Sequence, residues 1–168
     1  MQYLAADAAL RARRVRLVIF DVDGVLTDGR LWYGAKGDVL KVFHAFDGHG
    51  IKLLQYAGLV TAILSGRRSP AVTARAKELG IKHALQGIED KRAAFEKMLK
   101  KFRIAADAAA YMGDDLVDLP VLERCGFACA PREAPRDVRA RVHAVPTAGA
   151  GLGAVREVCE YILRAQGK

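Results

Sequence analysis

The sequence lacks the features that mark secreted, disulfide-bonded and membrane-spanning proteins. Its cysteines, Cys125, Cys129 and Cys159, are odd in number and lack the paired spacing of a zinc site, which favours buried, reduced thiols. No apolar run approaches the roughly 20 residues that a bilayer-spanning helix needs. Residues 1–16 are basic but have no apolar core of the kind found in signal peptides, and we expect a short amphipathic helix there. These absences predict a cytoplasmic protein without a membrane partner.

Basic residues exceed acidic ones, but they are spread along the whole chain. Lys and Arg number 27 against 19 Asp and Glu, which gives a formal net charge of +8. No run of five basic residues occurs and no nucleic-acid-binding motif is present, so we expect no nucleic-acid partner. The excess charge fits a solvated basic surface, and it also fits a positive field that attracts a small anionic substrate. Composition alone leaves both interpretations open.

Short apolar segments alternate with amphipathic ones along the chain. Apolar runs that stop at polar residues predict strands at 15–20, 59–64, 83–85, 108–112 and 126–129. Apolar residues at helical spacing predict helices at 48–57, 70–79, 91–102 and 153–165, with a short helix after Asp115. Such alternation is typical of the α/β class. It predicts a three-layer, Rossmann-like arrangement in which helices cover both faces of a parallel sheet.

Residues 30–43 interrupt this alternation. Two strand-like runs flank a Gly-Ala-Lys-Gly segment, which predicts a β-hairpin inserted directly after the first strand. The hairpin is too short to be a separate cap domain, and the chain has no repeat, low-complexity tract or obvious linker. We therefore expect residues 1–168 to form a single domain, with a hairpin flap at about 30–43 and a C-terminal tail at about 147–168.

Acidic residues follow two of the predicted strands. The first strand is followed by one pair and the 108–112 strand by another, with a fifth acid one helical turn later: Asp21, Asp23, Asp114, Asp115 and Asp118. Ligands of open parallel sheets bind beyond the carboxyl ends of the strands, where these carboxylates should converge. Converging carboxylates repel one another unless a cation lies among them, and hard oxygen ligands suit Mg²⁺. Any one of these residues could be only a turn or helix-cap residue, but together they favour a metal site.

Four segments of the chain resemble, in order, the motifs of the haloacid dehalogenase superfamily of phosphatases. DVDGVLTDG at 21–29 is similar to the first motif, and GDDLVD at 113–118 is similar to the fourth. Ser65, after the second strand, is similar to the second motif, and Lys91 to the third. A single Asp-x-Asp pair would be weak evidence, but four motifs in this order are specific.

The resemblance narrows to one family of that superfamily, the 3-deoxy-D-manno-octulosonate 8-phosphate phosphatases. It rests on the hairpin and on FDGHGIKLL, SGRRSP, GDDLVDLPV and GAVREVCEYIL, and it runs from about residue 15 to the C-terminus. The resemblance implies hydrolysis of that sugar phosphate, a step toward lipopolysaccharide. It also implies a homotetramer whose hairpins meet and cover neighbouring active sites, and a mobile glycine-rich stretch at 149–153 near a neighbour's site.

The same resemblance assigns a role to each site residue. Asp21 would attack phosphorus, and Asp23 would act as acid and then as base while binding the metal through its backbone carbonyl. Asp114 would be a direct carboxylate ligand of Mg²⁺, with Asp115 beside it, bound to the metal directly or through water. Asp118 would orient Lys91 or the water molecules on the metal. Phosphate and substrate would be held by a further group of residues, namely Ser65, Gly66, Arg67 and Lys91.

Several alternatives stay open on the sequence alone. The substrate could be the 9-phosphate of a nine-carbon, sialic-type acid, and Arg67 could bind its carboxylate or simply cover the surface. Lys91 could be a solvated surface lysine. The domain could also be a non-catalytic tetramerisation module, although it keeps Asp21, Asp23 and Asp114. A phosphatase acting on nucleic-acid ends is a weaker possibility that rests only on charge.

Overall fold

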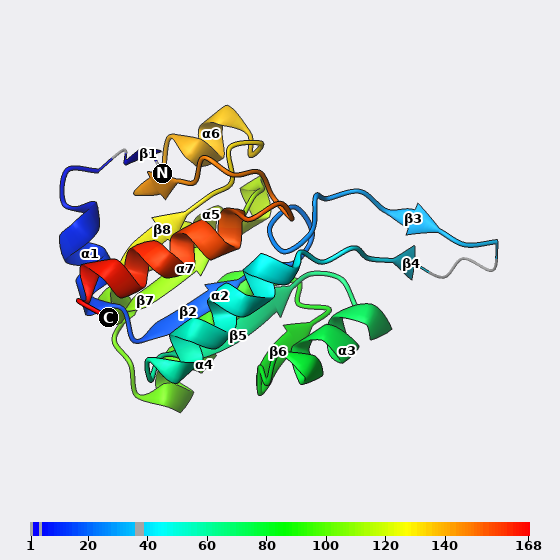
Figure 1. Ribbon diagram of the computed structural model, residues 1–168, viewed down its shortest axis with the longest axis horizontal. Helices are drawn as coiled ribbons and strands as arrows, with labels where there is room; N and C mark the ends of the chain where they lie inside the picture. The colour runs from blue at the N-terminus through cyan, green and yellow to red at the C-terminus, as the bar shows by residue number, and fades with distance from the viewer. Residues whose placement is uncertain (1, 4, 36–38) are drawn as a thin grey trace.

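The computed structural model, which describes residues 2–3, 5–35 and 39–168, contains one central sheet with helices on both faces (Figure 1). The strands lie in the order β1-β9-β8-β7-β2-β5-β6, and all neighbouring pairs except β1 with β9 are parallel. The strands of this sheet are β1 (Gln2–Tyr3), β2 (Leu17–Phe20), β5 (Val60–Ser65), β6 (His83–Gln86), β7 (Ala109–Met112), β8 (Phe127–Cys129) and β9 (Ala144–Val145). The predicted α/β class is confirmed.

Alternating side chains of the central strand divide the core into two layers. Val18 and Phe20 of β2 face one layer, whereas Leu17 and Ile19 face the other. The first layer is covered by α1 (Ala8–Arg14), α2 (Ala45–Tyr56), α3 (Pro70–Glu78) and α7 (Ala154–Ala165), and α2 and α7 lie side by side in Figure 1. The second is covered by α4 (Lys91–Phe102), α5 (Leu119–Leu122), α6 (Arg136–Arg139) and the 3-10 helix η1 (Ala106–Ala108).

The predicted hairpin is present and projects from the body of the domain (Figure 1). Its strands, β3 (Trp32–Tyr33) and β4 (Val39–Leu40), pair antiparallel and form a separate sheet. Residues 36–38 at its tip lie outside the described part of the chain. Among the described residues, no helix has both the length and the apolar character that crossing a bilayer requires.

Helix α2 begins earlier than the sequence predicts, at Ala45 instead of residue 48. Glycine is unfavourable inside a helix, so a helix starting at Gly48 is the cautious expectation. The structure instead places Gly48 and Gly50 within α2, because this helix packs closely on α7. A Cβ atom at position 50 would lie 3.1 Å from the Arg156 Cα atom. Close packing of the two helices therefore outweighs the low helix propensity of glycine.

Asp47 joins α2 to the start of α7. Its side chain is buried, and its carboxylate accepts hydrogen bonds from the backbone N–H groups of Gly153 (3.2 Å) and Arg156 (2.8 Å). The first N–H groups of a helix have no partner within the helix, so Asp47 caps α7 from a position more than 100 residues away. Asp47 therefore holds the end of the glycine-rich stretch at 149–153, in which the N–H of Gly151 also donates to the Val25 carbonyl (3.2 Å). The predicted mobility of this stretch and its predicted position near a neighbour's site stay predictions.

We expect the substitution Asp47→Ala to lower the free energy of unfolding by about 1–3 kcal/mol, because two partly buried N–H groups lose their acceptor. Urea unfolding followed by circular dichroism measures this change. Asp137→Ala is the matched control, since Asp137 is also an acid in the first turn of a helix but is exposed. Equal effects of the two substitutions would contradict the capping role.

Candidate active site

The carboxyl ends of three neighbouring strands bring the predicted motifs together. Strand β2 lies between β5 and β7, with Phe20 paired to Ile63 on one side and to Met112 on the other. The loops that leave these strands therefore meet at one edge of the sheet. They line a cavity of about 260 Å³, whose walls include every predicted site residue except Asp118, which lies behind it.

Asp21 lies at the floor of this cavity and is almost entirely buried. One carboxylate oxygen, Oδ1, accepts from the N–H of Val22 (2.7 Å), and the other, Oδ2, accepts from the Lys91 ammonium (2.8 Å). Gly24 then turns the backbone with a φ of +78°, a value that side chains disfavour. A Cβ atom at this position would lie 2.1 Å from Asp114 Oδ2, so only glycine allows the first and fourth motifs to approach this closely.

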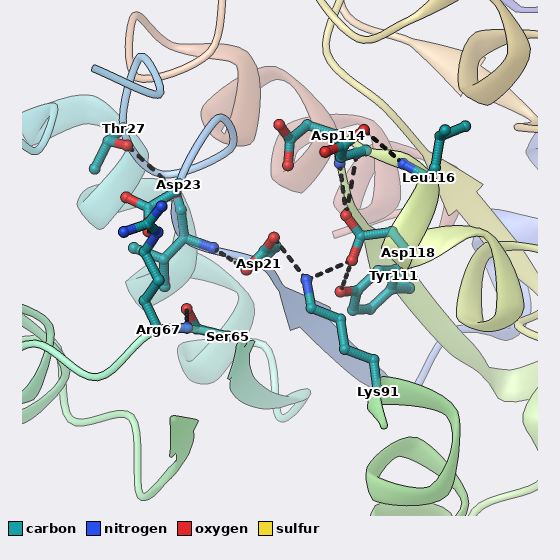
Figure 2. Close-up of polar contacts among 12 residues, drawn as sticks. Asp21, Asp23, Thr27, Ser65, Arg67, Lys91, Tyr111, Asp114, Leu116 and Asp118 are labelled. Carbon is teal, nitrogen blue, oxygen red and sulfur yellow. Dashed lines mark hydrogen bonds and ion pairs between the residues drawn. The ribbon is translucent and has the colours of Figure 1, made fainter. Parts of the chain in front are cut away.

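Lys91 is buried, which contradicts the alternative that it is a solvated surface lysine. It is the first residue of α4, and its side chain reaches between Asp21 and Asp118, as Figure 2 shows. Burial by itself would lower the pKa of Lys91, but the carboxylates of Asp21 and Asp118 outweigh it and raise the pKa above its usual value. The ammonium therefore stays charged at neutral pH.

Asp118 organises the residues behind the cavity. Its Oδ1 accepts from Lys91 Nζ (2.7 Å) and from the Tyr111 hydroxyl (2.5 Å), while its Oδ2 accepts from the N–H groups of Asp114 (3.1 Å) and Asp115 (3.2 Å). Both oxygens are thus engaged, and the side chain is fully buried. Asp118 therefore holds the lysine with one oxygen and the loop of the fourth motif with the other.

Asp21, Asp114 and Asp118 form an acidic cluster, with one oxygen from each lying within 4.8 Å of the others. Burial, followed by the charge of Asp118, raises the pKa of Asp21 to about 6 although Lys91 opposes the shift. Burial, followed by the charges of Asp21 and Asp118, raises the pKa of Asp114 to about 7. Carboxylates that resist ionisation in this way lack sufficient positive charge nearby. Because Asp118 is occupied by four donors, Asp21 and Asp114 are the side chains that fit a hard divalent cation such as Mg²⁺.

The raised pKa values predict that Mg²⁺ binds more tightly as pH increases. Protons occupy Asp114 below about pH 7 and Asp21 below about pH 6, and a cation must displace them. Without the cation, ionising these groups destabilises the fold as pH rises, because their pKa values are higher in the folded than in the unfolded state. We expect the apparent Mg²⁺ affinity to fall at least about 10-fold from pH 8 to pH 5. The measurement is the rise in unfolding temperature on adding Mg²⁺, which should be larger at pH 8. Asp114→Asn should remove most of this difference.

The loop after β5 forms the opposite wall of the cavity. Ser65 is buried, and its hydroxyl accepts from the Arg67 N–H at 3.4 Å, while Gly66 and Arg67 are exposed. The Arg67 guanidinium lies 3.9 Å from Asp23 Oδ2. Asp115 is exposed at the cavity and caps the 3-10 helix η2 (Leu116–Asp118) by accepting from the Leu116 N–H at 2.7 Å. The structure therefore brings all nine predicted site residues to one place.

Two further residues contact the predicted site, and sequence reasoning missed both. Tyr111 donates a hydrogen bond from its hydroxyl to Asp118, and its signal in the sequence is a polar group in an otherwise apolar strand (Ala-Ala-Tyr-Met). Lys41, directly after β4, donates to Asp23 Oδ1. No sequence pattern marks this role; the structure reveals it, because the Lys41 side chain is buried while the neighbouring apolar residues Leu40 and Val42 are exposed.

Comparison with known proteins places the chain in a family. No family model matches it. It is 42% identical over 165 residues to the 3-deoxy-D-manno-octulosonate 8-phosphate phosphatase of Escherichia coli strain K12. The aligned region covers 98% of this chain and 88% of that protein. The crystal structure of the phosphatase of that name from Moraxella catarrhalis, in complex with a magnesium ion, a phosphate ion and a KDO molecule, superimposes with a TM-score of 0.94. It is 41% identical, over 96% of this chain and 92% of that one.

A Legionella pneumophila structure described as a hydrolase of the HAD (haloacid dehalogenase) superfamily gives a TM-score of 0.95 at 40% identity, over 96% of this chain and 89% of that one. Sequence identity and structural similarity therefore agree over nearly the whole length of the chain. The chain belongs to the 3-deoxy-D-manno-octulosonate 8-phosphate phosphatase family of the haloacid dehalogenase superfamily.

Proposed function

We propose that this protein hydrolyses 3-deoxy-D-manno-octulosonate 8-phosphate to the free sugar acid and phosphate, with Asp21 as the nucleophile. The observation that carries the proposal is the position of the Asp21 carboxylate at the floor of the cavity, held by Lys91 and facing Asp114. A buried carboxylate beside a fixed ammonium and a cation-binding acid is suited to phosphoryl transfer, in which positioning and charge supply most of the catalysis. The names of the relatives support this substrate.

In the first step, an oxygen of Asp21 attacks phosphorus. A bond forms between this oxygen and phosphorus, the bond between phosphorus and the sugar oxygen breaks, and the leaving oxygen takes a proton from Asp23. Asp23 is suited to this role because it lies two residues after Asp21, lines the same cavity and is only partly buried. Lys91 and Ser65 would bind the phosphate oxygens as charge builds up on them.

In the second step, water releases the phosphate from Asp21. Asp23, now ionised, removes a proton from the water, whose oxygen bonds to phosphorus while the bond from phosphorus to Asp21 breaks. The products are inorganic phosphate and the original carboxylate. The side chains of Asp21 and Asp114 and the backbone carbonyl of Asp23 would hold Mg²⁺, which when bound supplies positive charge to the phosphate oxygens and relieves the repulsion among the carboxylates.

The cavity also has features that suit an acidic sugar. Arg67 is exposed at its edge, where a guanidinium can bind a carboxylate through two parallel hydrogen bonds. Leu31 and Val117 add apolar surface against which the carbon chain of a sugar can pack. The 9-phosphate of a nine-carbon, sialic-type acid would present the same two anionic groups, so it is the second candidate substrate.

We also propose that the protein is a homotetramer joined through its hairpins. Four large apolar side chains of the hairpin and its exit are more than half exposed, namely Trp32, Tyr33, Leu40 and Val42. A group of exposed apolar side chains of this kind is typical of a protein interface. Sedimentation equilibrium measures the number of subunits. A cytoplasmic location and a role in lipopolysaccharide synthesis also stay proposals.

Phosphate release from the purified protein tests the proposed substrate. The assay compares the eight-carbon sugar phosphate, the nine-carbon sugar phosphate and a 5′-phosphorylated oligonucleotide, each with Mg²⁺ and with a chelator. We expect release that depends on Mg²⁺ and is fastest with the eight-carbon substrate. Faster release from the nine-carbon substrate would favour the second candidate, and no release from any sugar phosphate would favour a non-catalytic module.

A further inference from the structure

Lys41 is a buried lysine in the stem of a hairpin whose apolar side chains point outward. Only 2% of its side chain is exposed, whereas 63% of Leu40 and 70% of Val42 are exposed. Burying an ammonium removes its hydration, and an anionic partner must compensate for that loss. The partner is the Asp23 carboxylate, to which Lys41 Nζ donates a hydrogen bond.

Asp23 lies between two cations that come from different segments. Lys41 from the hairpin binds Oδ1, and the Arg67 guanidinium from the loop after β5 lies 3.9 Å from Oδ2. The Asp23 side chain is 21% exposed and lines the cavity, so one face of the carboxylate stays open to a ligand there. Lys41 is nearly inaccessible, whereas Arg67 is mostly exposed and free to turn toward a substrate. The orientation of the Asp23 carboxylate is therefore set chiefly by Lys41.

We infer that Lys41 is a positioning residue that holds Asp23 facing the oxygen of the leaving group, so that the seating of the hairpin is coupled to proton transfer. This inference rests on the proposed function, because it requires Asp23 to donate the proton. An acid must lie within hydrogen-bond reach of the atom that it protonates, and a misdirected carboxylate slows the reaction even when substrate binding is intact. Loss of Lys41 should therefore lower the rate of proton transfer to the leaving group and leave substrate binding intact.

Substrates with different leaving groups test this inference. A sugar alkoxide needs a proton as it leaves, whereas 4-nitrophenolate leaves readily without one. The burst of leaving-group release that precedes steady turnover measures the first step alone, before Asp23 acts as a base on water. For Lys41→Met, we expect the burst rate on the saturating sugar phosphate to fall about 10–100-fold with little change in KM, and the burst rate on 4-nitrophenyl phosphate to fall less than about threefold. Lys41→Arg, which keeps a cation at this position, should recover most of the lost activity on the sugar phosphate.

Two variants separate this inference from the proposed function and from a general effect on folding. Asp23→Asn should show the same dependence of the burst rate on the leaving group with a larger loss; if it does not, the proposed role of Asp23 as the acid is wrong. If Asp23→Asn does show it but Lys41→Met slows the burst equally on both substrates or mainly raises KM, the inference about Lys41 is overturned. Lys97→Met, at an exposed position of α4, should change neither substrate's kinetics.

Discussion

Replacing Asp21 by Asn is expected to reduce phosphatase activity by about 10⁴-fold or more while leaving the protein folded. Asparagine has nearly the same shape as aspartate, but its amide cannot displace a sugar oxygen to form an acyl phosphate. Burial and the charge of Asp118 raise the pKa of Asp21 to about 6, so its ionised form is destabilising near pH 7.5. A neutral residue removes that destabilisation. In the presence of a chelator, the unfolding temperature of the variant should therefore equal or exceed that of the original protein.

Phosphate release and thermal unfolding, measured on the same preparations, check both parts of this expectation. Asp107→Asn is the control, because Asp107 is exposed in η1, just before β7, at the opposite end of that strand from the cavity. This control should change neither measurement. Turnover by the Asp21 variant at the original rate would mean that another group attacks phosphorus. A large loss of stability would instead mean that the ion pair with Lys91 outweighs the cost of burying the carboxylate.

The topology and the convergence of the candidate site residues were predictable because they depend on local sequence patterns. The runs at 15–20, 59–64 and 108–112 stop at polar residues, and the strands that they form are adjacent in the sheet. Once parallel strands are adjacent, their carboxyl ends must meet at one edge. The positions of Asp21, Ser65 and Asp114 follow from this rule without any knowledge of their side-chain contacts.

The features that sequence reasoning missed depend on contacts that no local pattern encodes. Asp47 caps a helix that begins more than 100 residues later, so no local pattern identifies it as a cap. Tyr111 is one aromatic residue in a buried strand and would be expected only to fill the core, yet its hydroxyl reaches Asp118. The edge strand β1 has only two residues and pairs with β9, which is equally short. Strands of this length give no periodicity from which to predict them.

Lys41 shows how the pattern of burial can carry functional information after the fold is known. In a hairpin packed on its own domain, apolar residues should point inward and lysine outward. The observed inversion places the lysine against Asp23 and leaves Leu40 and Val42 exposed. Both halves of the inversion fit the proposed homotetramer, in which the outer face of the hairpin would meet another subunit while the inner face contributes Lys41 to the candidate site.

Replacing Lys91 by Met should lower kcat about 100–1,000-fold, because the ammonium lies beside the proposed nucleophile Asp21, where negative charge would develop in the transition state. The substitution should also shift the rising limb of the pH–rate profile to higher pH. Lys91 lowers the pKa of Asp21, so its loss raises that pKa further and leaves less of the ionised nucleophile at any given pH. Initial rates between pH 5 and pH 9 measure both effects.

The same substitution should make stability depend more strongly on pH, because it leaves the buried Asp118 and Asp21 without their shared cation. Removing one member of a buried ion pair costs about 3–5 kcal/mol when the remaining charge is uncompensated. Urea unfolding in a chelator should show a loss of this size near pH 8, and a smaller one near pH 5, where a proton neutralises Asp21. Lys97→Met, on the exposed side of α4, controls for the loss of a charge from this helix. Wild-type kcat in the Lys91 variant would show that the buried ammonium is needed for folding alone.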